Sequence, residues 1–161
     1  MIQITSFKNP LKEICHKIVI LLILLKNDYF LNDSVDWFLL CADNGPCLGW
    51  RDGPNKPYQW LHYNETLLRA KNFGSGLVSL GLMPGSHTLI GLYSQNCPEW
   101  ILTEQACYTY SLVVVPLYDT LGPDACAFII NQAEINLVVV ENDTKCNLLL
   151  DKAPRYLIFL V

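Results

Sequence analysis

The fold is decided by residues 88–121, which read TLIGLYSQNCPEWILTEQACYTYSLVVVPLYDTL. Its largely apolar runs at 88–93 and 112–115 do not alternate with polar residues, which is typical of strands covered on both faces of a parallel sheet. Between them, a helix is predicted to begin at Pro98, because the first helical position has no use for the N–H that proline lacks. We expect this helix to continue to about Tyr110.

Upstream of this stretch, the sequence predicts an edge hairpin and a helix. Proline and glycine punctuate the chain from Gly45 onward, and the aromatic pattern at 58–63 favours an edge strand. Asn64 is a candidate N-cap for the helix that follows, and Gly81 is its expected end. The apolar residues of this helix recur every three to four positions, which is a helical period: Leu67, Ala70, Phe73 or Gly74, Leu77 and Leu80.

Downstream, a third helix is predicted to open at 120–124, followed by strands at 137–140 and 157–161. We expect this helix to present one apolar face, made of Ala125, Phe128, Ile129 and Ala133. Crossovers of roughly 20 residues between strands are long enough for helical, right-handed connections. The fold class is therefore α/β, an incomplete parallel, Rossmann-like sheet with helices on both faces. The domain organisation predicted is an apolar segment at 1–41 and a single domain at 42–161.

The segment 1–41 contains an uninterrupted apolar run at 18–25, with Lys17 and Lys26 at its ends. This run is much shorter than the roughly 20 apolar residues that a membrane-spanning helix needs. Three interpretations stay open: the core of a signal peptide, a short interfacial anchor whose lysines reach the membrane surface, or an apolar helix that packs on the domain. A second apolar cluster at 30–40 would suit an interface, so a membrane surface is a candidate partner.

Composition excludes several classes of function. The chain has 161 residues, of which 52% are hydrophobic and 16% charged, with a net charge of −4. No basic cluster is present, so we expect no nucleic-acid binding. The seven cysteines form no C-x-x-C pair, and those at 107 and 126 lie in apolar segments, which favours reduced, structural thiols. The three histidines lack helical metal spacing, so no zinc site is predicted. The triplet Asn142–Thr144 is one of three glycosylation sequons, which arise often by chance.

No catalytic, cofactor-binding or metal-ligating residue is assigned from the sequence. The glycines at 74, 76 and 81 lie within or just after a predicted helix rather than directly after a strand, so close helix packing explains them better than a dinucleotide loop. Neither a P-loop motif nor a G-x-S-x-G elbow occurs. Capping and dipole roles account for the carboxylates Glu99, Glu104 and Asp124. Asp119 is the most interesting acidic residue, because it lies just past a strand's carboxyl end, where ligands bind in open parallel sheets.

Several motifs resemble the opening segment of animal-type long-chain acyl-CoA synthetases, a branch of the adenylate-forming (AMP-binding) superfamily. The resemblance covers roughly 42–150, and the block Pro116–Leu121 is specific to this branch. It is carried by Cys41–Trp50, Pro57–Leu61, Gly91–Asn96, Pro98–Trp100, Glu104–Ser111 and Val115–Leu121. The resemblance implies the large amino-terminal domain of such a ligase, with ATP, Mg²⁺, coenzyme A and a fatty acid as cofactors and substrates of the full-length enzyme. It also implies the cytosolic face of the endoplasmic reticulum or the outer mitochondrial membrane; otherwise the chain is expected to be cytoplasmic.

The motifs that carry this family's chemistry are not among the 161 residues. The reaction needs a Ser/Thr/Gly-rich phosphate loop that ends in a lysine, and a mobile carboxy-terminal domain that contributes another lysine. We therefore expect the chain to be the amino-terminal portion of a long-chain fatty acid–CoA ligase and to be inactive by itself. The alternative is a non-catalytic module that pairs with a full-length synthetase through an exposed sheet edge. A nucleotide-binding fold without enzymatic role is a third option.

Overall fold

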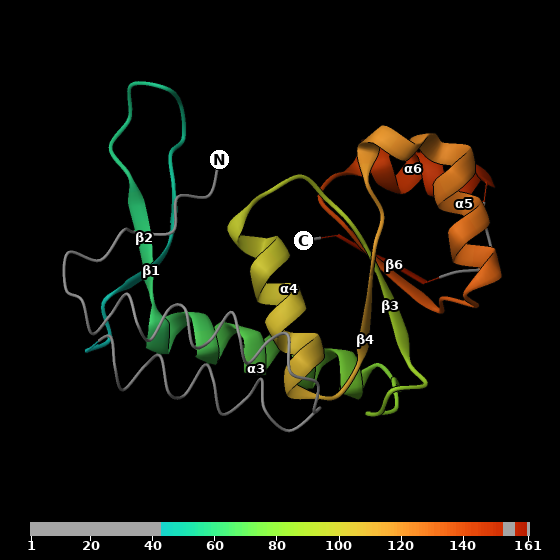
Figure 1. Cartoon of the computed structure of the whole chain (residues 1–161), viewed down its shortest axis with the longest axis horizontal. Coiled ribbons are helices and arrows are strands. Elements are labelled where there is room, and N and C mark those ends of the chain that lie inside the picture. Colours follow the sequence, from blue (N-terminus) through green and yellow to red (C-terminus); the bar gives the residue numbers. More distant parts are fainter. Residues whose placement is uncertain (1–42, 153–156, 161) are drawn as a thin grey trace, which may run out of the picture.

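The computed structural model describes residues 43–152 and 157–160. The predictions for 1–41 lie outside the described residues. A hairpin of two antiparallel strands comes first, followed by helices that alternate with the strands of a parallel sheet (Figure 1). In chain order the elements are β1 (Pro46–Trp50), β2 (Gln59–His62), α3 (Tyr63–Ser79), β3 (Leu89–Tyr93), α4 (Pro98–Thr109), β4 (Val113–Pro116), the 3-10 turn η1 (Asp119–Leu121), α5 (Gly122–Gln132), β5 (Leu137–Val140), α6 (Asp143–Lys152) and β6 (Leu157–Leu160).

The sheet has the strand order β4-β3-β5-β6, and all its neighbouring strands run parallel. Strand β3 is hydrogen-bonded on both sides, so that Ile90 lies between Val114 of β4 and Leu137 of β5. The chain leaves β3 in one direction to form β4 and then crosses back over β3 to form β5. The predicted parallel α/β sheet is confirmed.

The two faces of the sheet are covered by different helices (Figure 1). Successive residues of a strand point to opposite faces, and this alternation separates two buried clusters. On the α3 and α4 side, Ile90 and Leu92 pack with Leu77, Cys107, Leu112, Leu137 and Val139. On the α5 and α6 side, Tyr93 packs with Leu117, Cys126, Ile130, Ile135, Val138, Val140 and Leu149. The prediction of helices on both faces is confirmed, and Cys107 and Cys126 are buried as predicted.

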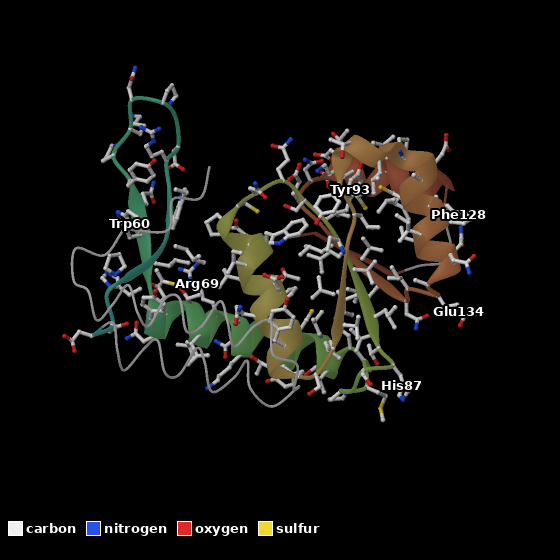
Figure 2. All side chains as sticks on the ribbon, viewed as in Figure 1. Trp60, Arg69, His87, Tyr93, Phe128 and Glu134 are labelled. Carbon is white, nitrogen blue, oxygen red and sulfur yellow. The ribbon has the colours of Figure 1, made fainter. Side chains whose placement is uncertain are left out.

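Two predictions of burial are wrong: that of the strand β4 and that of the apolar face of α5. The apolar run of β4 is partly exposed rather than buried, because β4 is the end strand of the described sheet. The strand also includes Pro116, which an edge position tolerates. In α5 the buried side is formed by Cys126, Ala127 and Ile130, whereas Phe128 is 66% exposed on the outer side of the helix (Figure 2).

Helix α6 has no counterpart among the predictions. It begins after Asn142, whose side-chain oxygen accepts a hydrogen bond from the N–H of Lys145 at 3.0 Å, which is the geometry of an N-cap. Its Leu149 is buried against the sheet. The N-cap predicted for α3 is also wrong: that helix begins at Tyr63, and His62 precedes it. Asn44, from before β1, instead accepts the hydrogen bond of the Asn64 N–H at 2.9 Å.

Helix α3 packs closely on α4 at Gly74, as predicted for this glycine. A Cβ atom at Gly74 would overlap the ring of Tyr110. That ring lies across α3, where its hydroxyl donates to the carbonyl oxygen of Lys71 at 3.1 Å. Two residues along, Gly76 is exposed, and a Cβ atom there or at Gly81 would meet nothing within 4 Å, so the close packing predicted for these two glycines is wrong. Gly74 and Gly76 therefore differ in packing while sharing one helix.

This difference predicts opposite effects of the same substitution. Gly74→Ala should lower the free energy of unfolding by about 1–3 kcal/mol, because the ring of Tyr110 has to move. Gly76→Ala should leave stability unchanged or raise it by up to about 1 kcal/mol, since alanine is the better helix former. Urea denaturation of the two variants measures both effects, and equal changes would contradict the packing of α3 on α4.

Candidate functional site

The candidate site lies at the carboxyl ends of β3 and β5, where the order of the parallel sheet reverses. The connection leaving β3 crosses one face of the sheet through α4, while the connection leaving β5 crosses the other face through α6 (Figure 1). Diverging connections open a crevice at such a switch point, and ligands of open α/β sheets bind there. A hollow of about 410 Å³ occupies this position in the structure.

The loop of residues 94–97 separates this hollow from a second one. The first hollow lies on the β5 side of the loop and includes Glu141 and Asn142 in its wall. The second, of about 390 Å³, lies on the β4 side beside Tyr118 and Asp119. Trp100 lines both, and its ring stacks on that of Tyr118 with centroids 6.2 Å apart. The loop is thus a shared wall, and its position sets the shape of both hollows.

Glu141 holds this loop from the neighbouring strand. Its Oε2 accepts hydrogen bonds from the N–H of Gln95 at 2.5 Å and from the hydroxyl of Ser94 at 3.2 Å. Burial would raise the pKa of Glu141, but the hydrogen bonds from Gln95 and Ser94 and the ion pair with Lys145 outweigh it and lower the pKa below its ordinary value. Glu141 is therefore ionised at neutral pH.

Lys145 is the cation of the site. Its Nζ lies 2.6 Å from Oδ1 of Asp119 and 3.0 Å from Oε1 of Glu141, and only 10% of its side chain is exposed. It also lies 4.6 Å from the centre of the Tyr93 ring, a cation–π distance. Burial would lower the pKa of Lys145, but the two carboxylates outweigh it and raise the pKa. Figure 2 shows Tyr93 at the end of β3, below α5 and α6.

Asp119 lies where the sequence predicted, just past the end of β4, and its partner there is Lys145. Glu99 lines the first hollow from the first turn of α4. The other two acidic candidates lie elsewhere: Glu104 accepts a hydrogen bond from the Tyr108 hydroxyl, and Asp124 lies in the first turn of α5. Sequence reasoning missed Glu141 and Lys145. The end of the strand at 137–140 was the available signal for Glu141, whereas Lys145 depended on the unpredicted α6.

The comparisons with known proteins identify the family. The sequence profile of the AMP-binding enzymes matches residues 44–157. The chain belongs to the AMP-binding enzyme family. It is 51% identical to long-chain-fatty-acid–CoA ligase 6 of Mus musculus and 44% identical to ligase 1 of Homo sapiens, each over 117 residues. Those matches cover 73% of this chain but only 17% of either relative. The resemblance noted in the sequence is confirmed.

Several solved structures share the fold. A VinN complex with 3-methylaspartate superimposes with a TM-score of 0.67 at 18% identity, over 81% of this chain and 34% of that one. A long-chain-fatty-acid-CoA ligase, FadD1, from Archaeoglobus fulgidus has a TM-score of 0.63 at 17% identity, over 81% of this chain and 27% of its own. At such low identity, these matches show the fold alone.

The site does not fit the magnesium and ATP phosphates that the family resemblance implies. In residues 43–152 and 157–160, no three histidine, cysteine or acidic side chains lie close enough to hold a metal ion. Lys145 is already paired with two carboxylates, whose two negative charges more than neutralise its single positive charge. What the site offers is a polar loop wall with an aromatic stack beside it, which is suited to binding and positioning.

The pKa shift of Glu141 predicts a pH-dependent contribution to stability. Because its pKa is lowered on folding, this contribution is present above the ordinary value of 4.5 and is lost as pH falls through the lowered pKa. At pH 7, Glu141→Gln should cost about 2–3 kcal/mol in the free energy of unfolding. The difference between the two proteins should shrink as the pH falls below 4.5 and through the lowered pKa of Glu141.

Urea denaturation across this pH range measures the difference. The exposed i,i+4 pair Arg69–Glu65 supplies the control, because Glu65→Gln should cost no more than about 0.5 kcal/mol at any pH. A difference between wild type and Glu141→Gln that stays constant from pH 7 to pH 3 would contradict the assignment of Glu141 as an ionised acceptor.

Proposed function

We propose that this chain is part of a long-chain fatty acid–CoA ligase and forms one sheet region of its large amino-terminal domain. The observation that carries the proposal is the identity of 51% and 52% to ligase 6 of mouse and human over 117 residues. The probable CoA ligase CCL6 of Humulus lupulus, 42% identical over 113 residues, supports a role in the formation of CoA thioesters. The chain spans about 17% of the length of these curated relatives.

The proposed reaction has two halves. A fatty carboxylate and ATP give an acyl-adenylate and pyrophosphate, and the thiol of coenzyme A then displaces AMP to give the thioester. In this proposal the described residues form the walls of the ligase domain: the loop at 94–97 and the turn at Asp119 shape the carboxyl end of the sheet. The 161 residues contain no phosphate loop, so we propose that they do not catalyse the reaction by themselves.

A second candidate function is a non-catalytic module that pairs with a full-length synthetase. The observation that favours it is β4, the end strand of the sheet in the part of the chain that the structure describes, which is partly exposed, with Val113 36% exposed. Unpaired edges of this kind readily accept another strand. Co-precipitation with ligase 6 supports pairing, and a monodisperse monomer that does not bind the ligase contradicts it.

We further propose attachment to the cytosolic face of the endoplasmic reticulum or the outer mitochondrial membrane. The support is the apolar run at 18–25 with its flanking lysines, together with the family resemblance. No helix in the described ranges is both long and apolar enough to cross a bilayer. Fractionation of cells that express the tagged chain tests the proposal. Recovery of the chain with those membranes supports it. Recovery in the soluble fraction, from lysates prepared without carbonate extraction, contradicts it.

The ligase proposal predicts two results that belong together. The purified 161-residue chain should form no acyl-CoA from palmitate, ATP and coenzyme A. A chimera in which residues 44–157 replace the matching segment of mouse ligase 6 should retain acyl-CoA formation, within about tenfold of the parent, because a shared fold and 51% identity preserve most packing. Radiolabelled palmitate measures both.

The controls separate folding from function. A second chimera carrying Leu92→Asp should be inactive, because it buries a charge in the centre of the sheet. A folded but inactive first chimera would contradict the ligase proposal, and turnover by the isolated chain would contradict the claim that it is inactive alone. Circular dichroism verifies that the first chimera is folded.

A further inference from the structure

The loop at 94–97 depends on Glu141 for its contacts to another strand. Within the loop, the Ser94 hydroxyl reaches the Gln95 carbonyl at 2.9 Å and Sγ of Cys97 at 3.3 Å. Both of these contacts are local and do not tie the loop to another strand. The contacts from Gln95 and Ser94 to Glu141 tie it to the end of β5, across 46 residues of sequence.

Glu141 is in turn held by Lys145. The Lys145 ammonium lies between Glu141 and Asp119 and so connects the ends of β5 and β4 to α6. A buried lysine is costly unless it is paired, and here two carboxylates pair it. Oε1 of Glu141 is contacted by Lys145 and accepts a hydrogen bond from Nδ2 of Asn142 at 3.1 Å, and Oε2 accepts from the loop, so the carboxylate is held at both oxygens.

We propose that Lys145 is a positioning residue of this site: through Glu141 it fixes the loop at 94–97, and through Asp119 it fixes the opposite wall at η1. The two hollows beside the loop keep their shape only while this lysine is in place. An effect of Lys145 on substrate binding rests on the proposed ligase function. An effect of Lys145 on the position of the loop does not depend on that function.

Four variants separate positioning from general stability. Lys145→Met removes the charge, Lys145→Arg keeps it, and Glu141→Gln and Asp119→Asn each remove one of its partners. Because Lys145→Met leaves two carboxylates unpaired, it is the variant most at risk of not folding. Lys145→Arg and the two single-partner variants keep the test open in that case. Glu65→Gln is the control, since it removes an ion pair of the same i,i+4 spacing from an exposed surface.

Amide hydrogen exchange in the 161-residue chain tests the loop directly. Exchange at Gln95 should be about tenfold faster in Glu141→Gln and in Lys145→Met, because the charged hydrogen bond that protects its N–H is lost or loosened. Asp119→Asn, Lys145→Arg and Glu65→Gln should change it by less than about threefold. Unchanged exchange at Gln95 in folded Glu141→Gln, or an equal change in Asp119→Asn, would overturn the proposal.

Kinetics of the ligase 6 chimera test the consequence for binding. Lys145→Met should raise the KM for at least one of palmitate, ATP and coenzyme A by about tenfold while kcat changes less than about twofold, and Lys145→Arg should restore most of the loss. A proportional fall in activity at constant KM would show a merely structural lysine and overturn the proposal. An inactive parent chimera contradicts the ligase function alone, and hydrogen exchange then decides the role of Lys145.

Discussion

The described structure depends on the pairing of β3 with a parallel strand on each side. Ile90 and Gly91 lie between β4 and β5 in register, and this central position makes both faces of the sheet available to helices. The two buried clusters lie on opposite faces of the sheet, and each contains residues of the strands together with residues of the helices that cover that face. The same pairing brings the carboxyl ends of β3, β4 and β5 together, and with them Ser94, Asp119 and Glu141.

The buried lysine of α6 places a charge beside a sheet that is itself built of apolar residues. Its desolvation costs several kcal/mol, which the two carboxylates and the face of Tyr93 offset. Replacing the lysine and both carboxylates together by well-packed apolar residues would often be as stable or more stable, whereas removing the lysine alone leaves two carboxylates unpaired. The geometry gives a reason for a lysine here. Its ammonium pairs with Asp119 after β4 and with Glu141 after β5, while Glu141 also accepts a hydrogen bond from the loop at 94–97. An apolar side chain could not hold these two carboxylates together.

Much of the fold could be predicted from sequence, because apolar runs and helical periods report burial directly. The strands at 89–93 and 137–140 and the helix that begins at Pro98 follow from such local signals. The exposure of β4 and of Phe128 could not be predicted, since it depends on which strand ends the sheet and how α5 is rotated on it. Helix α6 was missed because its leucines are consecutive, at 148–150, and do not recur at a helical period. In addition, Asn142, which caps the helix, was interpreted only as part of a glycosylation sequon. For the site, Asp119 was accessible to sequence reasoning, but its pairing with Lys145 required the tertiary structure.

The central claim is that β3 is paired in parallel on both sides, and nuclear Overhauser effects in the isotopically labelled chain measure it most directly. We predict interstrand backbone effects from Gly91 to both Val115 and Val138, in the pattern of parallel strands. Effects to only one of these residues, or close Hα–Hα contacts typical of antiparallel pairing, would contradict the account.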